Sequence, residues 1–243
     1  MQRSRWLPIL WLPCLGVPTR AVVGGAPVSP EAVALDGETV VGEHDYNRGY
    51  PSENPDGSVN AVIEIPAGTT AKFEIAHDGR LRWEHDRDDD SRREIDYLAY
   101  PVNYGSVPCT LAADGDALDV IVLGRAIERG RVAHTRMIGV LEMADADGVR
   151  DDKVIAVPLD ADLANGFTKL HDLGELDLRY AGSRAILLVW FSSYWGLGNT
   201  HVIGWGDAAD AARVLDEAKA CIGSLAAAGP RPRARPPSGA RAR

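Results

Sequence analysis

The seven residues DGDALDV, from Asp114 to Val120, constrain the fold more than any other part of this 243-residue chain. Three carboxylates crowd a short stretch, and two such charges about 4 Å apart repel by about 4 kcal/mol at an effective dielectric near 20. Gly115 permits a turn between them, after which the apolar residues 118–124 read as a buried strand. The pattern predicts a loop and a strand start whose carboxylates converge and need compensating cations.

Carboxylate ligands that leave room for water suit Mg²⁺ or Mn²⁺ better than zinc, which prefers His and Cys. An EF-hand is a poor fit, because the frame that begins at Asp114 lacks the required Gly and Glu. A phosphatase of the Asp-x-Asp-x-Thr kind is disfavoured, because Leu118 replaces the hydroxyl residue. For this segment alone, an ordinary solvated acidic turn remains the alternative.

Charge is distributed unevenly along the chain, whose formal net charge is −9. Residues 1–21 and 229–243 contain eight arginines and no acid, so residues 22–228 carry −17. A body this acidic disfavours nucleic-acid binding, which needs a basic face for phosphates. Hydrophobic content of 45% and charged content of 25% are typical of a soluble globule.

The two ends of the chain differ from the body in composition. Residues 1–21 have a basic start, an apolar run and then small residues, which is typical of a secretory signal peptide cleaved after Ala21 or Ala26. The apolar run is too short to span a bilayer, so we expect export to the periplasm or medium, with a cytoplasmic location as the alternative. Residues 229–243 should be a disordered basic tail.

The body divides into an extension over residues 22–58 and a single catalytic domain over residues 59–228. The extension is rich in Gly, Pro and acids, and we expect it to wrap around the domain. Cys109 and Cys221 do not make a disulfide framework. We expect both to be buried thiols, and the sequence leaves open whether they pair.

Short strands dominate the first part of the domain, and helical periodicity appears only late. Residues 71–75 are expected to return as the hairpin partner of 59–66. Asp78-Gly79 and Asp147-Gly148 mark further hairpins. The predicted strands are 59–66, 71–75, 81–85, 102–108, 118–124, 134–143 and 153–159, and the predicted helices lie near 170–177, 180–195 and 207–228. This order predicts an α+β domain with a mostly antiparallel sheet, closed into a small barrel with flanking helices.

Charged residues fall at or inside the predicted strands. Glu64 lies within the apolar VIEIP, where an unpartnered carboxylate would cost several kcal/mol. Lys72 and Glu74 share one face of their strand, and Lys153 lies on the same side as Asp151. Each is more often an ordinary surface charge when taken alone, but together with DGDALDV they indicate a site.

In these segments the chain resembles the soluble family I inorganic pyrophosphatases. The resemblance covers about Val59 to Gly206 and depends on VIEIP, AKFEI, YPVNYG, DGDALDV, GVLEM followed by DDKVIAVP, and WFSSY, in that order. It implies a five-stranded OB-like barrel with flanking helices. It also implies a Mg²⁺-dependent diphosphatase, with Mn²⁺ as a substitute ion and homo-oligomers among the relatives.

The resemblance also implies roles for individual residues. Metal ligands would be Asp114, Asp119 and Asp151, completed by Asp145 and Glu64. Asp116 would activate the attacking water, assisted by Tyr104 and Lys153. Phosphate oxygens would be held by Lys72, Arg93 or its neighbour Arg92, Tyr104, Lys153 and Tyr194, with Glu74 and Tyr100 supporting the site from behind.

The implied reaction is hydrolysis of inorganic diphosphate to two orthophosphates. Two metal ions can lower the pKa of a shared water and neutralise the substrate, while lysine, arginine and tyrosine donors stabilise the phosphate oxygens. One residue departs from the family pattern: Trp195 follows Tyr194 where lysine is common. The alternatives are a divalent-cation or phosphate binder without turnover, and a hydrolase of another phosphoanhydride.

Overall fold

The computed structural model describes residues 20–86, 88–196 and 198–228, the last nine of these by backbone alone. Most of the expected signal peptide and the whole of the expected basic tail lie outside these residues. Within them, no helix has the length and apolarity needed to cross a membrane.

Five strands form the centre of the fold, and their pairings return to the starting strand. β10 pairs with both β5 and β11, and the circuit continues from β11 through β9 and β8 back to β5. Every pairing is antiparallel except that of β9 with β11. The five strands are β5 (Val59–Ile65), β8 (Asn103–Ser106), β9 (Asp119–Val122), β10 (Val132–Asp145) and β11 (Lys153–Pro158). The expected α+β fold with a mostly antiparallel OB-like barrel is confirmed.

Apolar residues dominate β5, β9 and β11, which favours strands buried on both faces. Every residue of β5 and β11 is buried, as expected for strands covered on both sides. Gly105 lets β8 approach β5 closely, since a Cβ atom there would overlap the carbonyl oxygen of Val62. The hairpin between β10 and β11 closes through Gly148, whose φ is 81°, as Asp147-Gly148 predicted.

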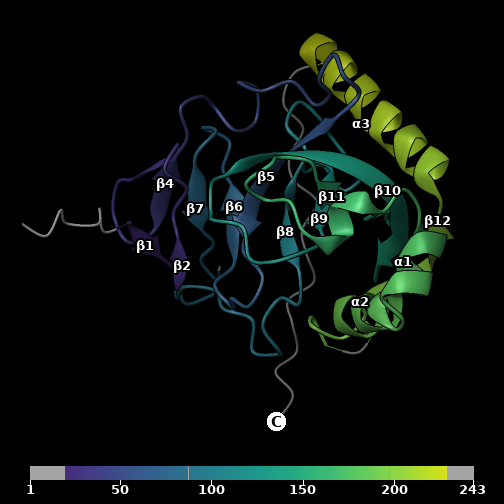
Figure 1. Cartoon of the computed structure of the whole chain (residues 1–243). Helices are drawn as coiled ribbons and strands as arrows, with labels where there is room; N and C mark the ends of the chain where they lie inside the picture. Colours follow the sequence, from purple (N-terminus) through teal and green to yellow (C-terminus); the bar gives the residue numbers. More distant parts are fainter. Residues whose placement is uncertain (1–19, 87, 197, 229–243) are drawn as a thin grey trace, which may run out of the picture.

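Helices cover one side of the barrel (Figure 1). α1 (Leu173–Arg179) begins at Asp172, whose side chain accepts the N–H of Glu175, and α2 (Ser183–Phe191) is shorter than the predicted 180–195. α3 (Ala208–Ala228) begins after Asp207, whose carboxylate accepts two backbone N–H groups as an N-cap should. A 3₁₀ turn, η1 (Gly166–Lys169), precedes them.

The sequence analysis missed β12 (Thr200–Gly206), which pairs with β10 outside the five-strand circuit. Its sequence THVIGWG contains two glycines and a short polar start, which weakens the strand signal. β12 adds a sixth strand to the barrel sheet and connects α2 to α3.

The extension contributes strands on the opposite side of the barrel from the helices (Figure 1). It contains β1 (Val22–Val23), β2 (Ala26–Pro27), β3 (Val33–Ala34) and β4 (Thr39–Val41), and β4 pairs with β7 (Leu81–Trp83). β7 in turn pairs with β6 (Phe73–Ile75). The extension therefore completes a second, four-stranded sheet.

The expected hairpin between residues 59–66 and 71–75 is wrong. β6 pairs with β7, whereas β5 pairs with β8 and β10. Pro66 follows β5 and lacks a backbone N–H for a continued ladder, and Gly68 has a φ of 82°, which turns the chain out of the sheet. The segment 71–75 thus leaves the barrel and joins the extension.

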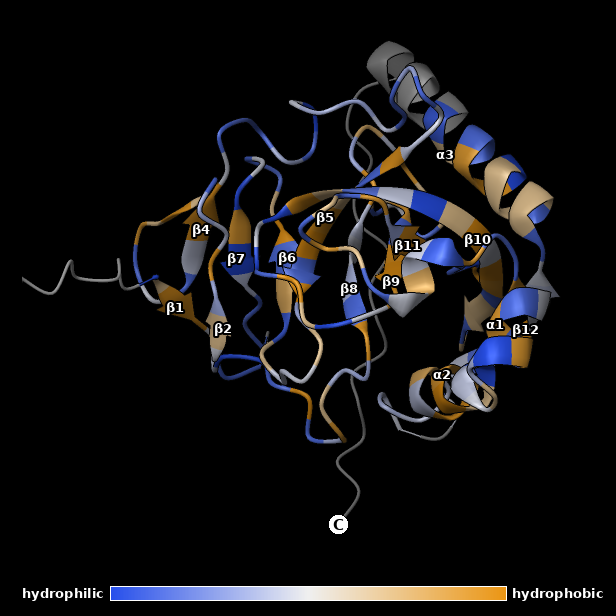
Figure 2. Cartoon of the chain, viewed as in Figure 1, coloured by the Kyte–Doolittle hydropathy of each residue, from blue (hydrophilic) through white to orange (hydrophobic). Residues whose placement is uncertain are grey.

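Three apolar clusters hold these parts together, and hydrophobic residues concentrate on the barrel strands (Figure 2). One lies between the barrel and α1–α2, one between the barrel and α3, and one between the extension and β6–β7. The third cluster also borders Arg129, which is fully buried with its guanidinium carbon 3.6 Å from the Phe73 ring centroid. Its three guanidinium nitrogens have no hydrogen-bond partner among the described residues.

Cys109 is a free thiol and is only partly buried, so the expectation of a buried thiol is wrong for this residue. Its backbone has a φ of 53°, which places it in a turn after β8 and not inside a strand. The side chain of Cys221 lies outside the described part of the chain.

Candidate active site

The site centres on a buried lysine between two aspartates. The parallel pairing of β9 and β11 places Lys153 directly opposite Asp119. The Lys153 ammonium donates to Asp119 at 2.7 Å and to Asp151 at 2.8 Å, and its side chain is 1% exposed. We call Asp114, Asp119, Asp151 and Lys153 the acidic centre. Charge-assisted bonds of this kind compensate for the desolvation of a buried ammonium.

Tyr104 joins the acidic centre from β8. Its hydroxyl donates to Asp119 Oδ2, the oxygen that also accepts from Lys153. Burial and the nearby Asp119 charge raise the pKa of Tyr104 well above its ordinary value. The phenol therefore stays protonated and remains a hydrogen-bond donor at neutral pH.

Asp114 and Asp116 approach the acidic centre on the turn that Gly115 permits, with a φ of 95°. The backbone N–H of Asp116 donates to Asp114 Oδ1 at 3.1 Å. Burial, followed by the negative charge of Asp119, raises the pKa of Asp114 to about 7. Asp116 is exposed. Asp114 on the loop thus interacts electrostatically with Asp119 at the strand start.

The carboxylates of the acidic centre do not titrate alike. Burial raises the pKa of Asp151 to about 6 despite the opposing Lys153 charge. Burial also opposes ionisation of Asp119, but the Lys153 ammonium outweighs it and lowers the Asp119 pKa. The two carboxylates beside Lys153 thus differ, because the pKa of Asp119 is lowered while that of Asp151 is raised towards neutral pH.

Glu64 is buried on β5, 5% exposed, as a second carboxylate layer beneath the acidic centre. Ser106 on β8 donates to its Oε1 at 2.6 Å. Burial raises the Glu64 pKa to about 8, against the opposing charge of Lys72. The partner that the sequence analysis required for this carboxylate is therefore present as a hydroxyl and a nearby cation.

Aromatic rings surround the lysines. The Lys72 ammonium lies 5.6 Å and the Lys153 ammonium 5.5 Å from the Tyr104 ring centroid. Tyr194 stacks on Trp190 with centroids 4.6 Å apart and planes at 9°, and Tyr100 lies 5.4 Å from Tyr104. Burial raises the Tyr194 pKa, so its hydroxyl also stays a donor at neutral pH.

The two candidate arginines occupy different environments. Arg93 Nη1 donates to Glu84 at 2.5 Å, and its guanidinium carbon lies 3.7 Å from the Trp195 ring centroid. Its backbone carbonyl accepts the N–H of Lys72 at 3.1 Å. Arg92 is exposed and binds Glu38 on the extension. The structure brings Arg93, and not Arg92, together with Lys72.

Asp145 and Glu74 lie at the edge of this arrangement. The Asp145 carboxylate accepts N–H groups of Asp147 and Val149 at 2.9 and 2.8 Å, so it caps its own hairpin. Glu74, on β6, interacts electrostatically with Glu64. Asp145 makes no hydrogen bond to the acidic centre within the described part of the chain.

Sequence reasoning missed Ser106 and Glu84. Ser106 lies two residues beyond Tyr104 on β8, so strand alternation alone puts it on the Tyr104 face. Glu84 follows β7 and contacts Arg93, a pairing between segments that no local pattern reveals. Its other carboxylate oxygen, Oε2, is buried without a hydrogen-bond partner in the described part of the chain.

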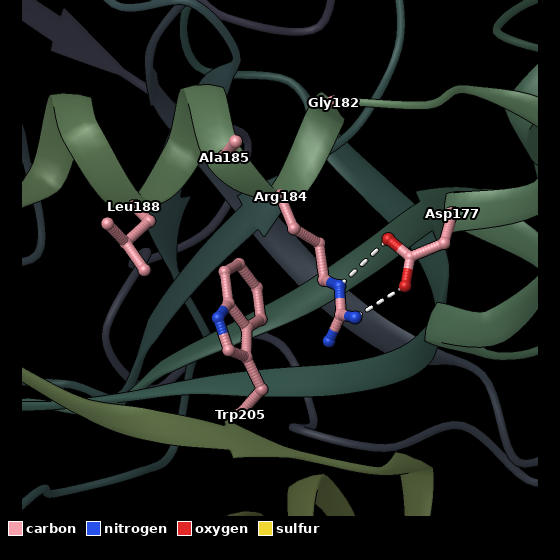
Figure 3. Close-up of a pocket in the computed structure, with 6 residues that line it drawn as sticks. All are labelled: Asp177, Gly182, Arg184, Ala185, Leu188 and Trp205. Carbon is pink, nitrogen blue, oxygen red and sulfur yellow. Dashed lines mark hydrogen bonds and ion pairs between the residues drawn. The ribbon is translucent and has the colours of Figure 1, made fainter.

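A separate hollow lies between α1, α2 and β12. Figure 3 shows Asp177 binding Arg184, whose guanidinium carbon lies 5.3 Å from the Trp205 ring centroid. The hollow measures about 290 Å³, and none of its lining residues belongs to the acidic centre. In this hollow the one arginine, Arg184, is neutralised by the one carboxylate, Asp177. The hollow therefore lacks the excess of acidic residues that characterises the candidate active site.

The donor chemistry of the acidic centre fits a hard divalent cation. Its possible metal ligands are carboxylate oxygens. Burial and mutual repulsion raise the pKa values of Asp114 and Asp151, and a divalent ion removes both penalties. Within residues 20–86, 88–196 and 198–228, no group of three or more Asp, Glu, His or Cys side chains is arranged so that it could hold a metal ion. Instead, the Lys153 ammonium lies between Asp119 and Asp151.

Comparisons with known proteins show the family of the chain. The family profile described as inorganic pyrophosphatase matches residues 61–222. The chain is 35% identical to the inorganic pyrophosphatase of Gluconobacter oxydans, over 72% of this chain and 98% of that protein. It is 36% identical to the inorganic pyrophosphatase of Neisseria meningitidis serogroup B, over 69% and 90%.

Solved structures give the same result for the fold. The inorganic pyrophosphatase of Thermus thermophilus is similar with a TM-score of 0.62 and 28% identity, covering 74% of this chain and 99% of that one. The type I inorganic pyrophosphatase of Toxoplasma gondii is similar with a TM-score of 0.69 and 25% identity, covering 80% and 97%.

Proposed function

The chain belongs to the inorganic pyrophosphatase family, and we propose that the acidic centre is where it hydrolyses inorganic diphosphate to two orthophosphates. Family membership makes the chain an inorganic diphosphatase, a hydrolase of a phosphoanhydride bond. One observation carries the assignment of the site: the buried Lys153 ammonium between Asp119 and Asp151, with Tyr104 on the same oxygen. This cluster combines acids for cations with donors for phosphate.

A divalent cation, Mg²⁺ or in its place Mn²⁺, would be held by the acids of the site. These are Asp114, Asp119 and Asp151, with Asp145 and Glu64 as the remaining acids. When bound, such an ion neutralises the substrate and lowers the pKa of a coordinated water towards 7.

Residues of the chain would carry out the remaining roles, which are proton transfer and phosphate binding. Asp116, exposed at the tip of the turn, accepts the proton of the attacking water. Lys153 and Tyr104 donate to phosphate oxygens as negative charge develops on them, which is the largest contribution in reactions of this type. Lys72, Arg93 and Tyr194 bind the remaining oxygens and fix the orientation of the substrate.

Phosphate release from diphosphate with Mg²⁺, measured on purified protein, tests this function. Asp116→Asn should lower kcat by about 100-fold or more, since general acid–base groups contribute about 10²–10⁴. Asp216→Asn, on the exposed face of α3, is the matched control and should keep the parent rate. Parent protein that binds diphosphate but never releases phosphate, with Mg²⁺ or Mn²⁺, would contradict the assignment. Preference for a nucleoside triphosphate would instead identify a different phosphoanhydride.

We also propose export, supported by the basic, apolar and then small residues at positions 1–21. Sequencing the N-terminus of the protein recovered from the periplasm or medium should give a start at Val22 or Pro27. Recovery of the protein with Met1 in the cytosol contradicts export.

Assembly and domain limits are further proposals. Exposed apolar side chains on α1, α2 and β12 support a homo-oligomer: Leu178, Ile186, Val189 and Ile203. Sedimentation of the purified chain tests this.

We propose a catalytic domain over residues 59–228, with 22–58 as an extension, although β4 also pairs with β7 of the domain. Limited proteolysis locates the boundary.

A further inference from the structure

Trp195 contacts the guanidinium group of Arg93 across a large sequence separation. Arg93 precedes β8, and Trp195 lies in the turn after α2. The guanidinium carbon is 3.7 Å from the Trp195 ring centroid, well within the range of a cation–π contact. Trp195 is 37% exposed, which is unusual for so large an apolar side chain unless it has a surface role.

The position of Trp195 is fixed by its neighbours. Its ring centroid is 5.5 Å from that of Tyr194, which stacks on Trp190. Trp190 is buried, and its indole N–H donates to the carbonyl of Leu98 at 2.9 Å. The Trp195 ring therefore extends a rigid aromatic stack from the core to the surface, where it meets Arg93.

Arg93 is restrained at two different points. The Trp195 ring holds the guanidinium carbon 3.7 Å from its centroid, and Glu84 accepts from Nη1 at 2.5 Å. A cation–π contact does not require a hydrogen bond from arginine, whose five N–H donors lie in the guanidinium plane and point outwards. The pair of contacts thus orients the guanidinium while leaving in-plane donors for an oxyanion.

Arg93 is linked to Lys72 through its backbone and through Glu84. The Arg93 carbonyl accepts the Lys72 N–H, and Glu84, its carboxylate partner, acts electrostatically on Lys72. Tyr194, adjacent to Trp195, also acts on Lys72 and on Lys153. Arg93, Lys72 and Tyr194 therefore belong to one donor group.

We propose that Trp195 is a positioning residue that holds the Arg93 guanidinium in place for a phosphate oxygen of the substrate. The proposal builds on the diphosphatase function above. It assigns a role to the position where the sequence departs from the lysine common in the family. In this chain the Trp195 indole, which orients Arg93, stands in place of the additional cation that a lysine would supply.

A double-mutant cycle between Trp195 and Arg93 tests the proposal. Trp195→Ala should raise KM for diphosphate by about 3–30-fold, the range of a cation–π contact, with a smaller change in kcat. Trp195→Phe keeps an aromatic face and should recover most of the loss. In the Arg93→Ala background, Trp195→Ala should add almost nothing, because its partner is gone.

The same double-mutant cycle is also measured for ligand binding. This second measurement distinguishes a failure of the proposed diphosphatase function from a failure of the positioning role. The dissociation constant of imidodiphosphate, a non-hydrolysable analogue, is measured by calorimetry at fixed Mg²⁺ for all four proteins. Parent protein that binds imidodiphosphate without hydrolysing diphosphate contradicts the proposed function, and the coupling between Trp195 and Arg93 is still obtained.

The chain contains a matched control pair. Arg184 lies over Trp205 and binds Asp177, so an arginine, a tryptophan and a carboxylate also meet in a separate hollow (Figure 3). Arg184→Ala should leave both KM and imidodiphosphate binding at the parent values. Additive effects of Trp195→Ala and Arg93→Ala, or an unchanged KM in Trp195→Ala, would overturn the proposal.

Discussion

Lys153 and Arg129 are both buried cations in the interior of one protein, but their surroundings differ. Lys153 has two carboxylates at 2.7 and 2.8 Å. Arg129, between the barrel and the extension, has an aromatic ring at 3.6 Å and no hydrogen-bond partner among the described residues. The contrast teaches that burial of a cation does not by itself indicate an active site. The number of carboxylates and hydroxyl groups that converge on the cation is the better indicator.

The electrostatic response of the two groups follows from this difference. Burial works against both charges, but Asp119 and Asp151 outweigh it at Lys153 and raise its pKa well above the ordinary value. At Arg129 burial prevails over the more distant Glu64 and lowers the pKa to about 9. One cation is stabilised by its environment, and the other is a cost to folding.

Replacing each cation with methionine should change stability in opposite directions, and the larger change is expected at Lys153. Lys153→Met leaves Asp119 and Asp151 without their cation, and breaking a buried pair costs about 3–5 kcal/mol. Urea unfolding in the presence of a chelator measures this loss. Lys219→Met, in an outer ion pair on α3, is the control and should cost less than about 1 kcal/mol. Equal losses for the two variants would remove the distinction.

Arg129→Met should raise the unfolding free energy by about 1–4 kcal/mol, because an unpartnered buried charge is replaced by an apolar side chain of similar length. Its thioether would also contact the Phe73 ring favourably. The same urea titration measures the gain, and Arg129→Lys, which keeps the charge, should show none. A destabilised methionine variant would mean that Arg129 has an essential partner.

Ser106→Ala should lower stability by about 1–2 kcal/mol, because the buried Glu64 carboxylate loses its hydroxyl donor. The effect should be largest near pH 9, where Glu64, with a pKa of about 8, is ionised. Chemical unfolding at pH 6 and pH 9 checks this, with Ser192→Ala, outside the site, as the control. A loss that does not depend on pH would separate Ser106 from the Glu64 charge.

The last expected effect is a pH dependence of the stability of the metal-free protein. Glu64, Asp114 and Asp151 have pKa values raised to about 8, 7 and 6. The folded state therefore binds more protons than the unfolded state above about pH 4, and stability falls as pH rises through these values. Each pKa unit of difference between the folded and unfolded states is worth about 1.4 kcal/mol, so we expect the Tm to fall by about 10 °C or more from pH 5 to pH 8.

Addition of Mg²⁺ at pH 8 should reverse that fall, because the ion binds the ionised carboxylates of the folded state. Asp114→Asn should flatten the dependence without Mg²⁺, which would assign that part of the dependence to the acidic centre. Scanning calorimetry at both pH values provides the measurement. A Tm that rises with pH in the parent protein contradicts the raised pKa values.

Local patterns predicted the parts of the molecule that depend on neighbouring residues. DGDALDV predicted the turn at Gly115 and the strand after it, and Asp147-Gly148 predicted the hairpin that brings Asp151 beside Lys153. Alternation along the strand from Asp151 to Lys153 sufficed to place them on one side. The roles of these residues stay predictions until the variants are measured.

Other features depend on long-range contacts, which no local pattern contains. The contact of Arg93 with Trp195, the choice of Arg93 over Arg92, and the burial of Arg129 against Phe73 are all of this kind. The pairing of β6 was predicted wrongly because a strand signal does not specify its partner. β12 was missed because its glycines weaken a signal that pairing with β10 overrides.

The parallel pairing of β9 with β11 restricts how related chains can vary in length. An insertion of one residue inside β11 would turn Lys153 to the opposite face and carry the whole alternating set of side chains with it. Insertions in the hairpin before Asp151 leave that register intact. Relatives that keep the reaction should therefore differ in their loops and share the residue count of these two strands.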